Sequence, residues 1–401
     1  MNLCKKRAFA LMLTLVAAFG SRNGMASGFG LYEFSTSAHA LGGAVIGKAV
    51  DASAVFYNPA TLSDLTNHVL TMGFVTQHPR ARMKVDGGRA SPFDAGAFML
   101  PHVNVALPLP AGFAFGLGIG PEYGLGSAYD SDWDLVNSSE ETTVESLTLT
   151  PALAYALTDD LSVGLGLRFM WFDFEQLSQP YPGLIHHRLK GDNHCRSLGW
   201  QAGLRYRLTD DFAVGLVYKS PMQVDVDGKS TLDGMRDSWA DAETDILMPD
   251  SITAGFNWDI TDTWHLGAAF MWTQWSTVSV LDFKLGGESN PCELNWNDTY
   301  RFAIAPSWDF ARDWTWMASY AYETDSTGDQ RSTMLPAADR HLLATGLAWR
   351  VGMGFELQFS YGLILMAGKS SQASGVDGRL REYTPHRGLS HAVGFSISYS
   401  F

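Results

Sequence analysis

The sequence has little charge and almost no cysteine for its length. Charged residues make up 17% of its 401 residues, and it contains 3 cysteines. Ordinary soluble domains carry roughly 25% charged residues, so this composition is unusual for a soluble protein. Acidic residues outnumber basic ones, and the formal net charge is -14. The chain lacks the basic stripe of a nucleic-acid-binding protein, which predicts that nucleic acid is not a partner.

Long apolar runs are also missing. Residues 8–19 form one short apolar run, preceded by Lys5–Arg7 and followed by Gly24–Ala26. A basic region, an apolar run and small residues at a cleavage position are typical of a secretory signal. We therefore expect residues 1–26 to be removed and the mature chain to begin near Ser27. No later segment approaches the roughly 20 apolar residues that a membrane-spanning helix needs, so helical spans are excluded.

The cysteines leave one question open. Cys4 departs with the signal, whereas Cys195 and Cys292 stay in the mature chain. An exported protein folds where disulfides are permitted. A bridge between Cys195 and Cys292 is therefore possible, but the sequence does not give their distance. Two adjacent histidines, His186 and His187, have no spaced carboxylates beside them, so we predict neither a metal site nor a cofactor.

Period-2 alternation of apolar and polar residues dominates the mature sequence and predicts strands. The last segment shows it clearly, with Val393, Phe395 and Ile397 on one face and Ser396 and Ser398 on the other. We count about fourteen such segments, each near the length that a tilted membrane strand needs. They are 68–77, 96–107, 113–129, 145–157, 161–175, 194–208, 212–226, 250–260, 264–282, 296–310, 314–324, 341–350, 354–366 and 390–401.

The connections between these segments alternate between short turns and long polar stretches. The short turns are Pro108–Gly112, Thr158–Asp160, Thr209–Asp211, Thr261–Thr263, Ala311–Asp313 and Val351–Met353, and the long stretches include Asp227–Pro249, Asp325–Arg340 and Ala367–Leu389. Aromatic residues flank the short turns. This layout is typical of an outer-membrane barrel with short periplasmic turns, long external loops and an aromatic girdle. A soluble β-sandwich would also alternate, but its turns do not sort into two length classes.

Residues 27–67 precede the first predicted strand and contain no clean strand of their own. A barrel of about fourteen strands has a lumen too wide for side chains alone to fill. We therefore predict an all-β, transmembrane antiparallel barrel over residues 68–401 with an N-terminal plug, residues 27–67, folded inside it.

The order of several short motifs resembles the FadL family of outer-membrane long-chain fatty acid transporters, which includes toluene- and xylene-type channels. The first motif runs from Gly28 to Ser35 and on to Asn58-Pro59-Ala60, like the family's N-terminal hatch. Similar elements follow in order at Tyr123–Leu125, Pro151–Tyr155, Tyr218–Ser220, Trp272–Ser276, Trp296–Thr299 and Leu335–Arg340. In the last of these, Ala337 replaces the first aspartate of the family pattern. The resemblance implies capture of ligand by external loops, a binding site in the lumen and sideways exit at a kink in the third strand.

Two backbone motifs are candidates for that mechanism. Asn58, Pro59 and Ala60 form the hatch motif, although Asn-Pro also begins ordinary turns. Gly120 and Pro121 interrupt the third predicted strand, and proline within a sheet marks an edge or a bulge. Because a closed barrel has no edge, we predict a lateral opening there; an innocuous bulge is the alternative.

A fatty acid needs a cation for its carboxylate and an apolar tunnel for its chain. Strand alternation points several basic residues into the lumen, and each of them could equally be a solvated charge or an ion-pair member. Two inward methionines suit a loosely shaped apolar ligand. The carboxylate candidates are Arg168, Arg205, Lys219, Arg301 and Arg340, and the tunnel candidates are Met271 and Met317.

The predicted function is passive uptake of long-chain fatty acids across the outer membrane of a Gram-negative cell. The nearest rival is a channel for aromatic or alkane hydrocarbons with the same fold, and the others are an open porin and an adhesin. Enzymatic activity is not expected, because Ser390 and His391 are strand neighbours that point to opposite faces. We expect a monomer in contact with outer-membrane lipid and lipopolysaccharide.

Overall fold

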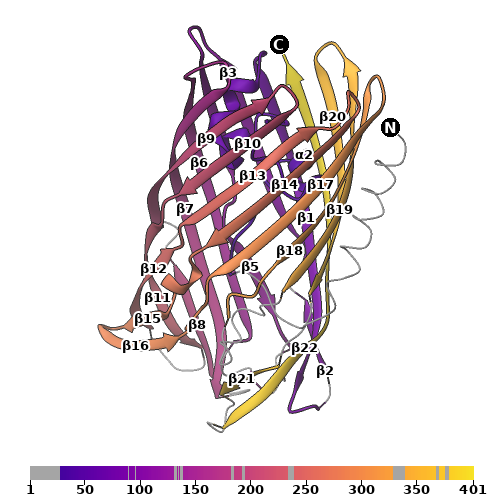
Figure 1. The fold of residues 1–401 in the computed structure, drawn as a ribbon. Coiled ribbons are helices and arrows are strands. Elements are labelled where there is room, and N and C mark those ends of the chain that lie inside the picture. The colour runs from indigo at the N-terminus through magenta and orange to yellow at the C-terminus, as the bar shows by residue number, and fades with distance from the viewer. Residues whose placement is uncertain are drawn as a thin grey trace.

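The computed structural model describes residues 28–401 except 89, 95, 131–132, 134, 136–138, 182–184, 192–194, 234–238, 328–338, 367–369 and 375–378. The predicted signal segment, residues 1–26, lies outside the described residues. Within the described part, no helix is long and apolar enough to cross a membrane. The chain instead forms one continuous antiparallel sheet that closes on itself (Figure 1).

The barrel has fourteen strands, and the ladder between the first and the last closes it. Residues 69–80 of β1 pair with residues 389–400 of β22 on one side, and residues 69–77 pair with 98–106 of β3 on the other. The barrel strands are β1 (Val69–Val85), β3 (Phe98–Pro108), β4 (Phe113–Gly120) with β5 (Gly124–Ala128), β6 (Glu141–Ala156), β7 (Leu161–Tyr181), β9 (Cys195–Thr209), β10 (Phe212–Lys219), β13 (Ser251–Asp259), β14 (Trp264–Thr273), β17 (Thr299–Ala311), β18 (Trp314–Glu323), β19 (Arg340–Gly352), β20 (Phe355–Met366) and β22 (Leu380–Ser400).

Shorter strands extend the sheet at the end opposite the C-terminus (Figure 1). They are β2 (Ala90–Asp94), β8 (Ile185–Gly191), β11 (Met222–Asp233), β12 (Trp239–Met248), β15 (Val280–Leu285), β16 (Glu288–Glu293) and β21 (Ser371–Ser374). The sequence predicts loops over Asp227–Pro249 and Ala367–Leu389, and the structure corrects this by placing β11, β12, β21 and half of β22 there. Each of these strands pairs with a neighbour, so the polar segments satisfy their backbone groups by extending the ladder.

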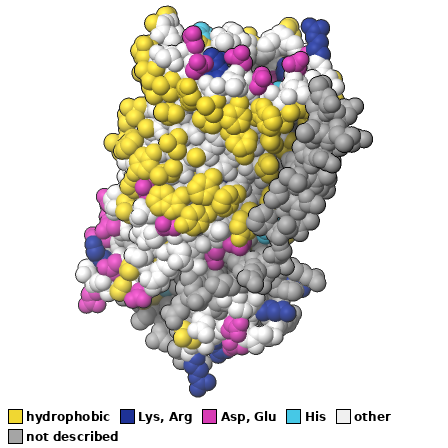
Figure 2. Space-filling model, in the orientation of Figure 1, with side chains coloured by type: hydrophobic (Ala, Val, Ile, Leu, Met, Phe, Trp, Pro, Cys, Tyr) yellow, Lys and Arg dark blue, Asp and Glu magenta, His cyan; other side chains and the backbone are white. Residues whose placement is uncertain are grey.

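The side chains are arranged inside out relative to a soluble β-protein. On β22, Val393 and Ile397 are exposed, whereas Ser390, Ser396 and Ser398 are buried. Apolar side chains form a band around the visible middle of the barrel, and charged side chains gather toward its two ends (Figure 2). Stacked tryptophans, Trp264 on Trp308 and Trp314 on Trp349, mark the edge of the band beside the short turns. This pattern is that of a lipid-facing barrel with an interfacial girdle.

The six predicted short turns are confirmed, since β3, β6, β9, β13, β17 and β19 each end where the sequence places a turn. Two predicted strands are wrong. Residues 212–226 are divided at Ser220 and Pro221, because β10 ends at Lys219 and β11 begins at Met222 with other partners. Residues 264–282 do not run straight, because β14 ends at Thr273 and a short 3-10 helix, η2 (Trp275–Thr277), interrupts it before β15. By alternation Trp275 lies on the same inward face as Thr273, and its ring is fully buried. Its packing against the N-terminal segment explains the break.

Residues 28–67 fold inside the barrel, near the end at which the chain terminates (Figure 1). This segment, called the hatch below, holds three short helices: α2 (Thr36–Ala40), α3 (Ala54–Tyr57) and the 3-10 helix η1 (Pro59–Asp64). The Ser35 hydroxyl caps α2 by accepting a hydrogen bond from the Ala38 amide at 3.1 Å. The largest cluster of buried apolar residues mixes hatch and wall side chains, so the hatch forms the core of the barrel.

Candidate functional site

Asn58 locks the hatch to itself and to the wall. Its Nδ2 donates to the Ile46 carbonyl at 2.7 Å and to the Leu204 carbonyl of β9 at 3.1 Å. Its Oδ1 accepts from the Ala60 amide at 3.0 Å and so caps η1. Pro59 is the first residue of η1, where its missing N–H costs nothing. The motif Asn58-Pro59-Ala60 thus lies at the contact between hatch and barrel.

Glycines on the lumen side of the wall make room for this motif. A Cβ on Gly203 of β9 would collide with the Asn58 side chain, and a Cβ on Gly164 of β7 would collide with the backbone of Pro59 and Ala60. The two glycines face each other across neighbouring strands. Neither glycine could be assigned to this contact from the sequence, because a glycine within a strand does not reveal what approaches it. Their recurrence on the inward face was the available signal.

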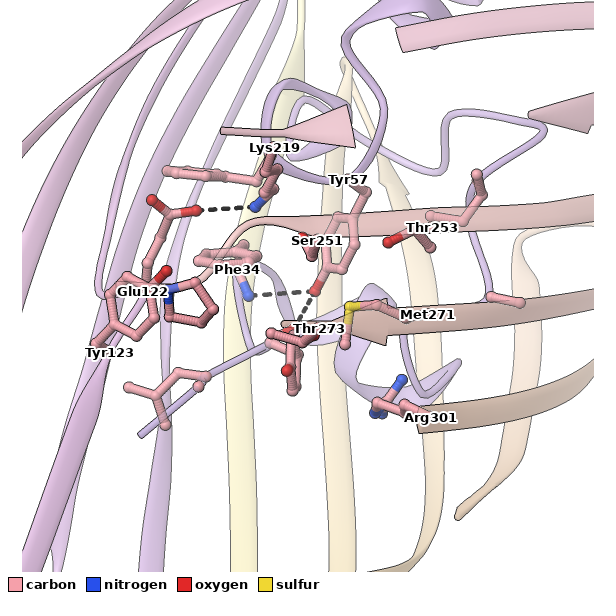
Figure 3. Close-up of a pocket in the computed structure, with 18 of the residues that line it drawn as sticks. Phe34, Tyr57, Glu122, Tyr123, Lys219, Ser251, Thr253, Met271, Thr273 and Arg301 are labelled. Carbon is pink, nitrogen blue, oxygen red and sulfur yellow. Dashed lines mark hydrogen bonds and ion pairs between the residues drawn. The ribbon is translucent and has the colours of Figure 1, made fainter. Parts of the chain in front are cut away.

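A cavity of about 80 Å³ lies between the hatch and the wall. In Figure 3, Glu122 and Lys219 occupy one side of it, and Met271 and Arg301 the other. The described residues that line it combine apolar and aromatic side chains with three cations and one carboxylate. They are Gly30, Leu31, Tyr32, Phe34, Gly43, Ile46, Phe56, Tyr57, Glu122, Tyr123, Arg168, Lys219, Pro249, Ser251, Thr253, Ala269, Met271, Thr273, Trp275 and Arg301.

The third barrel strand breaks beside this cavity. β4 pairs with β3 only as far as Ile119 opposite Val103, and Gly120 and Pro121 follow. When the strand resumes as β5, it pairs with β6. In the described part of the chain, no ladder joins β5 to β3. The predicted interruption at Gly120 and Pro121 therefore coincides with a local loss of strand pairing in the barrel wall.

The residues after the break turn into the lumen, where the hatch meets them. Tyr123 forms an isolated bridge with Gly30, in which the Leu31 amide donates to the Glu122 carbonyl and the Gly124 amide to the Phe29 carbonyl, both at 2.9 Å. The Phe29 ring packs on Trp275 and on Trp296, with centroid distances of 5.9 and 5.2 Å. The first described residues of the hatch thus rest against the break.

Glu122 pairs with two of the predicted cations. Its Oε2 lies 2.9 Å from Arg168 Nη2, and its Oε1 lies 2.8 Å from Lys219 Nζ. The side chains of Glu122 and Arg168 are 4% and 2% exposed, and that of Lys219 is 19% exposed. We call these three residues the Glu122 cluster. Sequence reasoning missed Glu122 because alternation assigns no face where a strand is broken; a carboxylate directly after Pro121 was the only signal.

The remaining candidates lie in different places. Arg301 lines the cavity, donates to the Gly42 carbonyl at 2.7 Å and lies 5.1 Å from the centre of the Tyr32 ring. Arg340 lines a neighbouring cavity of about 30 Å³ together with Glu33 and Glu323. Arg205 pairs with Asp64 of η1 at 3.1 Å and lines a separate polar cavity of about 470 Å³.

The two predicted tunnel methionines lie in different parts of the lumen. Met271 lines the cavity, whereas Met317 is buried in the core shared by hatch and wall. The structure therefore brings Arg168, Lys219, Arg301 and Met271 together around one cavity and keeps Met317 apart. The side chains of Cys195 and Cys292 lie outside the described residues, so their pairing stays a hypothesis.

Known proteins share both the fold and the sequence pattern. The family described as outer membrane protein transport protein (OMPP1/FadL/TodX) matches residues 17–401. Outer membrane protein P1 of Haemophilus influenzae is 24% identical over 88% of each chain. The long-chain fatty acid transport protein of Escherichia coli O6:H1 is 23% identical over 100% of this chain and 99% of its own.

Two solved structures show the same fold. A FadL homologue of Pseudomonas aeruginosa superposes with a TM-score of 0.85 at 19% identity, covering 94% of this chain and 100% of that one. The toluene transporter TodX of P. putida superposes with a TM-score of 0.75 at 18% identity, covering 93% and 99%. A closed lipid-facing barrel with a lumenal hatch defines an outer-membrane channel for hydrophobic compounds rather than an enzyme. The chain belongs to the OMPP1/FadL/TodX family.

Proposed function

We propose that this channel takes up long-chain fatty acids and releases them sideways through the break in the third barrel strand. The observation that carries the proposal is the cavity itself, where cations and apolar side chains meet directly beside that break. An amphipathic acid needs both kinds of contact, because a carboxylate leaving water requires a charged partner and its chain requires apolar surface.

Two cations are available to the ligand carboxylate. Lys219 is the most exposed member of the Glu122 cluster, and Arg301 lines the opposite side of the cavity. Met271, Phe34 and Trp275 provide apolar and aromatic surface between them. Arg168 is nearly fully buried and bonded to Glu122 and to the Ser220 carbonyl, so in this proposal it supports the site without contacting the ligand first.

The cavity is small for such a ligand. Pockets for small molecules usually have volumes of about 300–1,000 Å³, whereas this cavity has about 80 Å³. A long acyl chain therefore requires movement of surrounding groups. The segment Gly28–Leu31 is the best candidate to move, because it borders both the cavity and the break. Its movement would have to break two backbone hydrogen bonds and the ring contacts of Phe29.

One observation favours the rival hydrocarbon channel. Arg168 and Lys219 already share a carboxylate within the protein, and a neutral ligand would not disturb that arrangement. The solved toluene transporters have the same fold. Binding of laurate and of toluene to the purified protein in nanodiscs decides between the two: we expect saturable laurate binding that Lys219→Gln weakens. Binding of toluene alone would overturn the fatty acid proposal.

The lateral exit requires a separate experiment. Restoring strand chemistry with the double substitution Gly120→Ala and Pro121→Val should extend the β3–β4 ladder and slow laurate uptake by cells, with binding unchanged. Pro306→Val is a matched control, because Pro306 lies within β17 and opposite Leu266, away from the break. Uptake at the normal rate in the double variant would rule out exit at this place.

A further inference from the structure

The Glu122 cluster holds an excess of positive charge in a nearly water-free place. Two cations share one carboxylate, so the cluster as a whole carries one unbalanced positive charge. Buried charges are stable when they are paired, and an unbalanced one favours a further counter-ion. Lys219 is the member through which such an anion would enter, since it is the most exposed of the three and faces the cavity.

The cluster is also connected to the break and to the hatch. Glu122 directly follows Pro121, and its carbonyl accepts the hydrogen bond from Leu31 that holds the first described segment of the hatch. Arg168 comes from β7 and is fixed by the Ser220 carbonyl at 3.0 Å, while Lys219 comes from the end of β10. The two ion pairs therefore tie the break to two other strands of the wall.

A ligand carboxylate and the Glu122 carboxylate have the same chemistry and reach the same ammonium group. Among the described residues that line the cavity, Glu122 is the one acid beside three cations. An arriving carboxylate that binds Lys219 neutralises its charge and so weakens the ion pair between Lys219 and Glu122. The result is two cations with two carboxylates, which is electrically balanced and leaves Glu122 on Arg168 alone.

We propose that Glu122 is a built-in competitor for the ligand carboxylate, and that its displacement from Lys219 loosens the break and the hatch segment above it. Glu122 is then a specificity-determining residue of the channel. An anionic ligand breaks the ion pair between Lys219 and Glu122 and favours opening of the wall at the break. A neutral ligand of the same length leaves that ion pair intact. This inference rests on the proposed fatty acid function and adds how the channel distinguishes a carboxylate from an uncharged chain.

The test combines binding with hydrogen exchange on the full mature chain in nanodiscs, using laurate and the uncharged dodecanol. Glu122→Gln should bind laurate roughly tenfold more tightly, which corresponds to about 1.4 kcal/mol, and dodecanol as before. In the wild type, laurate should speed amide exchange in peptides that contain Leu31 and Gly124, whose amides donate across the bridge. Dodecanol should not.

A matched control is available on an external hairpin. Glu175 also pairs with two cations, Arg188 and Lys190, but it lies far from the break in sequence and is 30% exposed, against 4% for Glu122. Glu175→Gln should leave laurate binding and exchange unchanged. Lys219→Gln serves as the second variant: it should weaken laurate binding and should already show fast exchange at Leu31 and Gly124 without ligand.

The outcomes distinguish a failure of the proposed competition by Glu122 from a failure of the proposed fatty acid function. If the wild type binds laurate, but Glu122→Gln binds it equally or less tightly, the competition is overturned while the fatty acid function stands. The same holds if bound laurate leaves exchange at Leu31 and Gly124 unchanged. If Glu122→Gln does not fold, equal exchange in the wild type and in Lys219→Gln overturns the proposal. If the wild type binds no laurate, the proposed function itself fails.

Discussion

Single polar side chains of the hatch decide whether it stays in the lumen. Asn58 donates to two carbonyls, one within the hatch and one on β9. Asp is nearly the same size and can still accept from the Ala60 amide, but it cannot donate. Asn58→Asp should therefore remove both donated hydrogen bonds and weaken hatch docking by about 1–3 kcal/mol. Raised ion conductance of single channels would report the loosened hatch.

Gln372→Glu provides the control for that substitution, because Gln372 is exposed on β21, at the end of the barrel opposite the hatch, and the substitution adds the same charge. Its conductance should equal that of the wild type. An unchanged conductance and melting temperature in Asn58→Asp would contradict the assigned role of the Asn58 amide.

His39 should make hatch docking sensitive to pH. Burial lowers the pKa of this α2 imidazole from 6.5 to about 4, and the nearby positive charge of Arg301 acts in the same direction. Its Nδ1 lies 2.9 Å from the Ser360 hydroxyl. A displaced hatch would expose His39 and let it bind a proton near pH 6.5. Docking stability should thus be complete above about pH 6.5 and decrease as the pH falls toward 4.

Conductance recorded between pH 7.5 and 4 would measure this effect. It should rise as the pH falls in the wild type and should rise less in His39→Gln, where the side chain keeps polar atoms but cannot titrate. Identical profiles for the two proteins would show that another group governs the response.

Between elements, η1 can approach β7 and β9 closely because glycines, Gly164 and Gly203, face it from these strands. Gly203→Val places a branched side chain where Asn58 lies, so the hatch must shift or leave. We expect increased conductance and a lower melting temperature, with the barrel still resistant to unfolding by detergent. Ala202→Val adds bulk to the adjacent residue of the same strand, whose side chain points to the opposite face, and should have little effect. Equal behaviour of the two variants would show that the close packing at Gly203 is not required.

The elements differ in how far the sequence alone could predict them. The barrel strands and short turns could be predicted, because lipid outside and water or hatch inside impose a period of two over each strand. The break at Gly120 and Pro121 could also be predicted, since proline cannot donate to a ladder. The contact of Trp275 with Phe29 could not be predicted, because the two residues are 246 positions apart (275 − 29) and no local pattern records that contact.

Prediction of the binding site is limited in the same way, because local sequence patterns do not record contacts between distant residues. Alternation correctly suggested that Arg168 and Lys219 reach the lumen, where both now line the cavity. It could not show that Glu122 joins them, because Glu122 is positioned by the break and not by strand periodicity. Met317 likewise points inward, but it packs in the shared core because the hatch occupies that part of the lumen.

At the scale of the whole molecule, the hatch and the barrel depend on each other unequally. Apart from the two backbone hydrogen bonds at the break, the barrel closes by pairing between its own strands. The short helices of the hatch are instead enclosed by the wall and bury their side chains against it. A variant lacking residues 28–67 should therefore still insert as a barrel. It should melt at a lower temperature, because the apolar core between hatch and wall is lost.

That variant also tests what keeps the channel selective. With the lumen empty, single-channel conductance should rise from near background to an open-pore level, small polar solutes should enter cells, and laurate binding should disappear with the cavity wall. Removing the external strand β21, which pairs with β22 and lies outside the apolar cluster around Phe29, deletes sequence without removing a contact of the hatch and should leave conductance low. If the hatch-deleted barrel conducts no better than the wild type, strands alone close the bore, and the lateral route would no longer need the hatch to block the direct one.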